Sequence, residues 1–372
     1  MNSRFWAAAF TLTGTIVGAG ILGLPSVFAK SGFFIGLFWL LVLGGILIYV
    51  NLCMSEVCLR TKEKHQLSGY AKKYLGKNAG RLMFFAFAFG IYAALVAYLI
   101  GEGQSLSAMF GFSGQYTIYF AMAFWLVLTL LLREGLKGLK RVETWGVLAV
   151  ILIIFIIFFG FVFSIKLENL YFMDFSYSSL LLPFGIVFFA LLGFTSIPEL
   201  REEIRGKEKE LKKAILYGSL IPIVLYILFC IVGVGAFGMG VSEVATLSFG
   251  SFAILLGIFT MMTGYFSLSF CLRDSYVKDL KFSKFWTFIF VSVLPLLLYA
   301  IISYFNLLTF VKVLGIGGAV SGGLTGILVL WMNYKAKQKG DRKPEYSIPI
   351  NWFLIVLLSA IFAAGIIIEL FF

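Results

Sequence analysis

Two short segments hold the residues whose types and spacing indicate a binding site. The first, residues 14–25, reads Gly-Thr-Ile-Val-Gly-Ala-Gly-Ile-Leu-Gly-Leu-Pro. The second, residues 188–199, reads Phe-Phe-Ala-Leu-Leu-Gly-Phe-Thr-Ser-Ile-Pro-Glu. Glycine costs a helix interior about 1 kcal/mol relative to alanine, and proline costs about 3 kcal/mol. We therefore expect a helix to break within each segment and to leave backbone N–H and C=O groups free for a ligand.

The two predicted breaks suit opposite charges. In the first, free N–H groups and the positive end of the dipole of the second half-helix suit a carboxylate. The expected contacts are Gly18, Ala19, Gly20 and Ile21. In the second, freed carbonyl groups suit an ammonium group. The expected contacts are Phe188, Phe189, Ala190 and Leu191. Together the breaks can bind a zwitterion, and a Gly20→Val change is expected to block the ligand while the protein stays folded.

Four polar side chains in apolar surroundings are further candidates. Tyr98 can place its hydroxyl near the carboxylate, or it can be a packed aromatic residue bonded to nearby backbone. Thr263 and Ser267 are four residues apart and share a helix face, where they can bind sodium or bond to their own or a neighbouring helix. Glu102 has apolar sequence on both sides, so it is either an ion-coupling group or a solvated residue at the membrane interface.

The elements that must position these residues are transmembrane helices. The chain has 372 residues, of which 61% are hydrophobic and 13% are charged, so its nonpolar surface must face lipid. A helix needs ~20 residues to cross the bilayer, and about 11 runs without ionisable residues are long enough. The runs are 5–29, 31–55, 82–101, 103–132, 144–165, 175–198, 214–242, 244–272, 285–311, 313–334 and 347–368. The sequence therefore predicts an all-α membrane protein of about 11 transmembrane helices.

The net charge of +12 reflects membrane topology and not a nucleic-acid partner. Nearly all Lys and Arg residues lie at the N-terminus or in alternate loops, among them Arg133, Lys137, Lys140 and Arg141, whereas Lys30, Lys166 and Lys312 do not. By the positive-inside rule, the N-terminus is cytoplasmic and the C-terminus extracytoplasmic in a multi-pass protein of the cell membrane. Glu56 and Glu199 come at the cytoplasmic ends of two runs, where solvation or loop contacts are expected.

The predicted spans divide into two inverted halves. The breaks fall in the first and sixth spans, and because five spans separate them, the two broken helices enter the membrane from opposite faces. This pattern predicts a first repeat at 1–165, a second at 166–336 and an additional helix at 337–372. The alternative is that Gly14 and Gly18, a pair of small residues four apart, only allow close helix packing.

At these residues the chain resembles a known family. Residues 18–25 closely resemble the helix-1 signature of the amino acid/auxin permeases and of the bacterial aromatic amino acid permeases. Both belong to the amino acid–polyamine–organocation superfamily. The likeness continues through 56–57, 98–101, 197–200 and 212–222. It implies the leucine-transporter-like fold of five plus five inverted helices with one C-terminal helix, and symport of an amino acid by alternating access.

The substrate and the coupling ion are predicted with alternatives. Phe188, Phe189, Phe194 and Phe266 can line an apolar pocket for a large apolar or aromatic neutral L-amino acid, although core packing also explains them. The resemblance implies proton coupling, because Gly14 stands where sodium-coupled relatives often carry Asn. A proton needs a group whose charge can change, and Glu102 is the candidate. Sodium symport through Thr263 and Ser267, and a sensor that binds without transporting, remain alternatives.

Other functional classes fit the sequence less well. An enzyme needs convergent catalytic groups, but the chain has one His, in a predicted loop, and no pair of intramembrane aspartates. The four cysteines lack metal-type spacing, so neither a metal nor a cofactor is expected. A channel is expected to show a polar pore lining, and that pattern is absent. The expected partners are an amino acid and the lipid bilayer, and the sequence does not indicate an oligomeric state.

Overall fold

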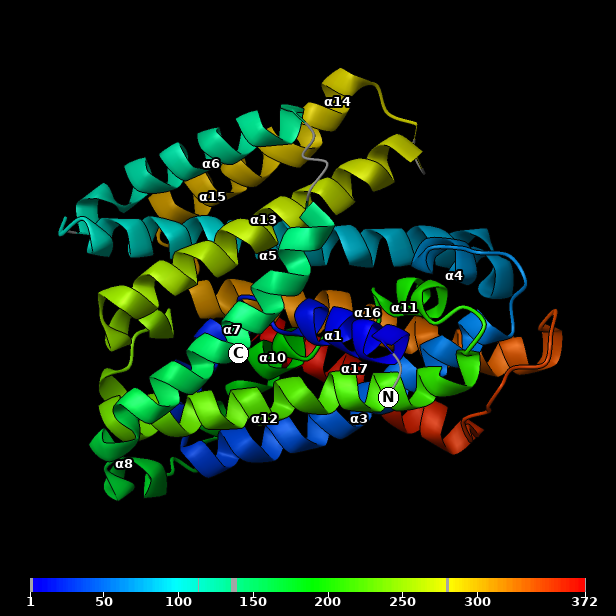
Figure 1. Ribbon diagram of the computed structural model, residues 1–372, viewed down its shortest axis with the longest axis horizontal. Helices are drawn as coiled ribbons and strands as arrows, with labels where there is room; N and C mark the ends of the chain where they lie inside the picture. Colours follow the sequence, from blue (N-terminus) through cyan, green and yellow to red (C-terminus); the bar gives the residue numbers. More distant parts are fainter. Residues whose placement is uncertain (1–2, 113, 135–138, 279–280, 372) are drawn as a thin grey trace.

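The chain folds into helices that run back and forth along one common direction (Figure 1). The computed structural model describes residues 3–112, 114–134, 139–278 and 281–371. Its α-helices are α1 (Ser3–Ile16), α2 (Gly20–Ser31), α3 (Phe33–Leu59), α4 (Leu67–Leu75), α5 (Lys77–Met109), α6 (Thr117–Glu134), α7 (Leu139–Phe161), α8 (Leu167–Tyr171), α9 (Tyr177–Leu181), α10 (Pro183–Ala190), α11 (Ile197–Glu203), α12 (Leu211–Phe237), α13 (Ser251–Lys278), α14 (Lys284–Phe288), α15 (Leu294–Tyr304), α16 (Phe310–Lys339) and α17 (Trp352–Phe371). A short π-helix, Ile289–Val293, joins α14 to α15.

The predicted all-helical membrane fold is confirmed. Within the described ranges, eight helices are long and apolar enough to cross a membrane, and α1 with α2 makes a ninth span that is bent by 55°. The remaining two predicted runs, 144–165 and 175–198, coincide with α7 and with the series α9, α10 and α11. Each predicted run therefore contains a helix.

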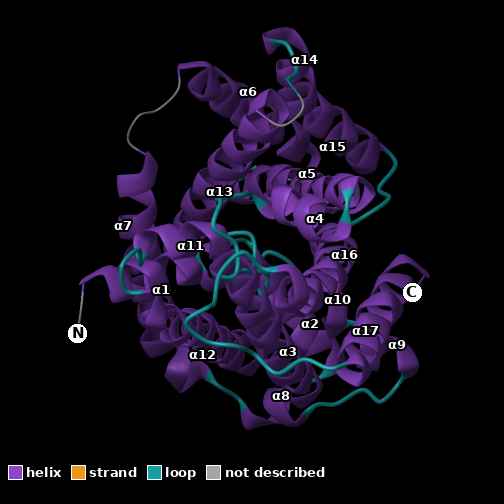
Figure 2. Cartoon of the chain, turned by 90° about the vertical axis from the view of Figure 1, so that its right-hand side faces the viewer, coloured by secondary structure: helices purple, strands orange, loops and turns teal. Residues whose placement is uncertain are grey.

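Burial separates a central group of helices from those at the surface. In α16, 78% of the most apolar window is buried inside the protein, against 28% in α17. Figure 2, which views the bundle from one end, places α2, α10 and α16 in the interior and α6, α7, α8 and α17 towards the outside. Glycines allow α16 to approach its neighbours closely, because a Cβ on Gly318 or Gly322 would collide with α10.

Both predicted breaks are present. The helix that starts the chain ends at Ile16 and resumes as α2 at Gly20, and α10 ends at Ala190 before α11 begins at Ile197. The two breaks lie against each other, because a Cβ on Gly20 would stand 2.6 Å from the Cα of Ala190. The division predicted at residue 336 falls inside α16, which continues to Lys339.

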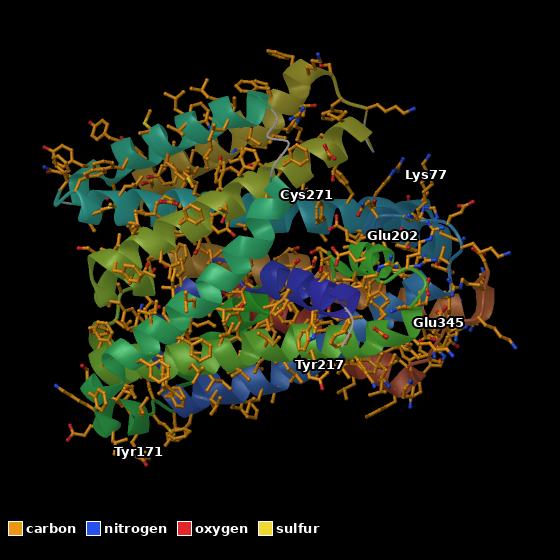
Figure 3. All side chains as sticks on the ribbon, in the orientation of Figure 1. Lys77, Tyr171, Glu202, Tyr217, Cys271 and Glu345 are labelled. Atoms are coloured by element: carbon orange, nitrogen blue, oxygen red, sulfur yellow. The ribbon has the colours of Figure 1, made fainter. Side chains whose placement is uncertain are left out.

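Basic segments from distant parts of the sequence meet at one end of the bundle, called here the basic end. Arg4 donates to the carbonyl of Arg205, and Lys64 pairs with Glu202. Figure 3 shows Lys77, Glu202 and Glu345 at this end and Tyr171 at the opposite end. The predicted basic residues Arg133, Lys137, Lys140 and Arg141 have side chains outside the described part of the chain. The arrangement agrees with the alternation of loops assumed for the topology.

Glu56 is buried rather than solvated at this end. Its carboxylate pairs with Arg60 at 2.8 Å and with Lys337 at 3.2 Å. It also accepts hydrogen bonds from the side-chain amide of Asn333 at 3.1 Å and from the backbone amide of Ile348 at 2.8 Å. The loop that follows α16 therefore folds back over the end of α3, which explains why a charge at the end of an apolar run is not exposed.

Candidate functional site

The break between α1 and α2 leaves backbone amides without helical partners. The Val17 amide still makes a helical bond to the Thr13 carbonyl at 2.7 Å, whereas the Gly18 amide turns out of the helix to the Ile16 carbonyl at 2.9 Å. Among the described residues, no backbone carbonyl accepts from the amide of Gly20, which begins α2. A free amide at the N-terminus of a helix is a favourable place for an anion. The Gly20 amide is therefore the clearest donor in the predicted carboxylate site.

Tyr98 on α5 lies at this break. Its side chain is buried, and its hydroxyl lies close to the backbone of Ala19. A Cβ on Gly18 would lie 3.7 Å from the same hydroxyl, and one on Gly264 of α13 would lie 2.9 Å from it. The structure thus brings Tyr98 together with Gly18 and Ala19. The hydroxyl proton of Tyr98 is left to donate to an acceptor at the break.

Most carbonyl groups at the second break already have partners. The Phe188 carbonyl accepts from the amide of Leu191 at 3.3 Å, and the Phe189 carbonyl accepts from that of Leu192 at 3.2 Å. These bonds tighten the last turn of α10, as is common at helix ends. Among the four predicted ammonium contacts, Leu191 is the one whose carbonyl accepts no hydrogen bond from the described residues.

The side chain of Phe188 points away from the break. Its ring stacks on Phe184 at a centroid distance of 5.6 Å and meets the edge of Phe362 on α17 at 5.4 Å. Phe188 therefore belongs to the core between α10, α16 and α17. The ring packs here as the core-packing alternative expected, and a place for Phe188 in a substrate pocket stays a prediction.

Tyr226 on α12 connects the two breaks and was not predicted from the sequence. Its fully buried hydroxyl oxygen lies 2.7 Å from the Ile16 carbonyl and 2.8 Å from the Ala190 carbonyl. These are the last residues of α1 and of α10, so the negative ends of two half-helix dipoles face each other. The single hydroxyl proton of Tyr226 lies between them and stabilises the pair. Nothing in the surrounding Leu and Ile residues marks Tyr226 in the sequence.

Gly20 is required for packing as well as for ligand access. A Cβ at this position would lie 2.6 Å from the Cα and 2.8 Å from the Cβ of Ala190. A Gly20→Val change therefore pushes α2 and α10 apart, and the expectation that it leaves the fold intact does not hold. Gly18 is the better probe, because a Cβ there meets the Tyr98 hydroxyl at ordinary contact distance.

The cavity that adjoins both breaks is small in this conformation. Its volume is about 10 Å³, and its lining includes Ile16, Leu191, Asn51 and Ser219. That volume holds about one water molecule and is too small for an amino acid. The side chains of α2 are buried apart from Lys30, which closes the approach from the opposite end. Binding from that side therefore requires α2 or α10 to move.

The candidate ion-coupling residues have different surroundings. Glu102 on α5 is fully buried, and neither of its carboxyl oxygens has a hydrogen-bond partner in the described part of the chain. The Thr263 hydroxyl donates to the carbonyls of Phe259 and Thr260 at 3.0 Å, so it bonds to its own helix. Ser267, one turn further along α13, is partly buried. The hydrogen bonds of the Thr263 hydroxyl are therefore satisfied within its own helix, without a sodium ion.

Comparisons with known proteins agree with this arrangement. The family model of the tryptophan/tyrosine permease family matches residues 1–239. Glutamine transporter 2 of Aliivibrio fischeri is 23% identical over 318 residues, which cover 80% of this chain and 81% of that protein. Tyrosine-specific transport system 1 of Haemophilus influenzae is 26% identical over 225 residues, which cover 59% of this chain and 54% of that protein. The low affinity tryptophan permease of Escherichia coli is 24% identical over 251 residues, with coverages of 62% and 58%.

A solved structure shows the fold. MhsT, crystallised in complex with L-phenylalanine, matches with a TM-score of 0.68 and 16% identity over 100% of this chain and 98% of its own. The leucine-transporter-like fold implied by residues 18–25 is therefore confirmed. The chain spans little more than half the length of the tyrosine and tryptophan relatives and about four fifths of the glutamine transporter. With residues 1–239 of 372 matched by the family model, the chain belongs to the tryptophan/tyrosine permease family, which comprises membrane transporters and not enzymes.

Proposed function

We propose that the protein is a secondary active transporter of neutral L-amino acids that works by alternating access. One observation carries this proposal: two broken helices meet near Gly20 and Ala190, and the Tyr98 hydroxyl lies beside Gly18 at the first break. Paired broken helices at inverted positions form the midplane substrate sites of many transporters. The fold shared with MhsT supports the same assignment.

The substrate carboxylate binds at the first break and the ammonium group at the second. The Gly20 amide, the dipole of α2 and the Tyr98 hydroxyl supply donors to the carboxylate. The Leu191 carbonyl accepts from the ammonium group. Because the adjoining cavity holds about one water molecule, the substrate enters only after α2 and α10 separate from their neighbours.

The basic end is the cytoplasmic end in this proposal. Lys and Arg residues from the N-terminus and from alternate loops gather there, as the positive-inside rule requires of a cell-membrane protein. The N-terminus is then cytoplasmic and the C-terminus extracytoplasmic. The buried side chains of α2 close the extracytoplasmic approach, so the described conformation is closed to the outside.

We favour a large apolar or aromatic substrate. Relatives named for tyrosine and tryptophan transport and the phenylalanine bound by MhsT support this choice. Glutamine is the second candidate, because the glutamine transporter matches the largest share of the chain among these relatives. A competition assay with tyrosine, tryptophan, phenylalanine and glutamine separates the two candidates, and glutamate as the best competitor would contradict both.

We favour a proton as the coupling ion. Glu102 is a buried carboxyl group without a partner among the described residues, and burying it as the neutral acid costs far less than burying an unpaired charge. A Glu102→Gln variant should then lose pH-driven accumulation and keep exchange of substrate down its gradient. Normal pH-driven accumulation by this variant would remove Glu102 from the coupling mechanism.

The test of the site uses two glycine substitutions. Gly18→Val places a branched side chain in the first break beside Tyr98, whereas Gly45→Val adds one on α3, where a Cβ has nothing within 4 Å. We expect Gly18→Val to abolish stabilisation of the purified protein by its amino acid in a thermal-shift assay. Gly45→Val should bind as the wild type does. Equal binding by both variants would move the substrate away from the first break.

A further inference from the structure

A third buried carboxylate, after Glu56 and Glu102, lies at the end of the bundle opposite to the basic end. Glu369 is in the last turn of α17, yet it is only 7% exposed. A Cβ on Gly185 of α10 or on Gly315 of α16 would collide with its carboxyl group. These two glycines therefore open a niche between three helices that fits a carboxylate.

The niche supplies a positive environment for Glu369. The Nζ atom of Lys312, in the first turn of α16, lies 3.5 Å from Oε1 of Glu369. Gly185 lies beside the carboxylate, because an added Cβ there would stand 2.3 Å from Oε2 of Glu369. Gly185 is in the first turn of α10, where the helix dipole favours a negative charge. Helix α10 carries no ionisable side chain, so Lys312 is the one ionisable group that the described structure places against Glu369.

This niche is mechanically connected to the candidate substrate site. Helix α10 has eight residues, so it behaves as a rigid rod of about 12 Å. Glu369 holds its first turn, while its last residue, Ala190, contacts Tyr226 and packs closely against Gly20. A change in the charge of Glu369 therefore acts on the half-helix that must move when the site opens.

We propose that Glu369 is a proton-binding site that controls the opening of α10. Its ionised carboxylate holds α10 against α16 and α17 through its ion pair with Lys312 and its attraction to the positive end of the α10 dipole. When one carboxyl oxygen takes a proton from solvent, the ion pair and the attraction to the α10 dipole are lost. The side chain of Lys312 is 33% exposed, so the niche reaches the surface of the bundle. This inference rests on the proposed transport function, and it adds a proton site distinct from Glu102.

The experiment measures opening without requiring transport. Ile186 of α10 is buried, and Gly23 of α2 lies close enough that an added Cβ would meet its side chain at 3.1 Å. Ile186→Cys is therefore a reporter of separation between α2 and α10. It is introduced together with Cys271→Ser, because Cys271 is the exposed cysteine among those described. The rate of maleimide labelling of the purified protein is then measured from pH 5 to pH 8.

In the reporter protein that keeps Glu369, we expect the labelling rate to rise roughly tenfold as the pH falls. This is the change expected from losing the ion pair and the dipole interaction. Glu369→Gln should label rapidly at every pH. Glu243→Gln is the matched control, because it breaks the Lys30–Glu243 pair near the same end, and it should keep the pH dependence. Lys312→Met is a second variant, and it should shift the midpoint of the profile to higher pH.

The proposal is overturned if Glu369→Gln keeps the pH dependence of the wild type, or if labelling does not vary with pH when Glu369 is present. If Glu369→Gln does not fold, an unshifted profile in Lys312→Met overturns it. Proton-driven uptake is measured separately in proteoliposomes. Its absence alongside a pH-dependent labelling rate would contradict proton-coupled transport and leave the Glu369 site standing.

Discussion

The replacement of Tyr226 by Phe tests how the two breaks are held together. The change removes one buried hydroxyl and keeps the ring that packs within the bundle. The Ile16 carbonyl retains a hydrogen bond from the Gly18 amide at 2.9 Å. The Ala190 carbonyl loses the hydroxyl at 2.8 Å, and no backbone amide of the described residues outside the regular helices donates to it. Tyr226→Phe therefore leaves one buried carbonyl without a partner.

The expected magnitude follows from that single group. A buried acceptor left unsatisfied costs about 1–3 kcal/mol. Since 1.4 kcal/mol is a factor of ten, the population in which α1 and α10 meet should fall roughly 5- to 150-fold. Substrate affinity falls by the same factor when the contact between α1 and α10 re-forms around the bound substrate after entry. The cavity of about 10 Å³ beside Ile16 can admit one water molecule to the carbonyl, which favours the lower end of the range.

The assay compares substrate affinity and uptake in two tyrosine variants. Tyr265 on α13 is also buried, but its hydroxyl has no hydrogen-bond partner in the described part of the chain. We expect Tyr226→Phe to weaken the apparent Kd at least about fivefold and Tyr265→Phe to leave it unchanged. Equal affinities for both variants would refute the inference that Tyr226 joins the two breaks.

Three further predictions concern the scaffold and the coupling ion. Glu56→Gln leaves Arg60 and Lys337 without their buried carboxylate, so it should destabilise the protein by about 3 kcal/mol, measured by thermal unfolding with the exposed Glu202→Gln as control. The Lys73 ammonium holds the pKa of Asp341 below its usual range, so their pair is complete above about pH 4 and is lost as the pH falls through the lowered pKa. Hydrogen exchange in residues 340–346 should therefore rise only in acid, and a rise between pH 7 and pH 5 would contradict this. Thr263→Ala should leave uptake unchanged with an imposed sodium gradient, because the hydroxyl bonds to its own helix, and loss of uptake driven by that gradient would favour the sodium alternative.

Local sequence was enough to predict the breaks and their surroundings. Gly18, Gly20 and Pro198 disfavour a continuous helix whatever surrounds them, so both interruptions could be located from composition alone. Tyr98 was predicted to reach the carboxylate, with a packed aromatic residue as the alternative, because a tyrosine within an apolar run can carry its hydroxyl into the bundle. The structure brings Tyr98 and Gly18 together.

Contacts between distant segments could not be predicted in the same way. Tyr226 acts on two helix ends that are 210 and 36 residues away, so its role depends on tertiary packing that no local pattern encodes. Glu369 follows the last apolar run, and its burial depends on Gly185 and Gly315, which lie on two other helices. Phe188 lay in a promising segment, but the direction of its side chain is set by α17.

Uptake by purified protein in liposomes tests the central claim most directly. Radiolabelled tyrosine, tryptophan, phenylalanine and glutamine are offered with an inward proton gradient or an inward sodium gradient, imposed separately. The account predicts saturable uptake of a neutral L-amino acid that is driven by the proton gradient, does not require sodium and is lost in Gly18→Val. Uptake no greater than in protein-free liposomes, or uptake that Gly18→Val leaves unchanged, would contradict the assignment of transport to the two broken helices.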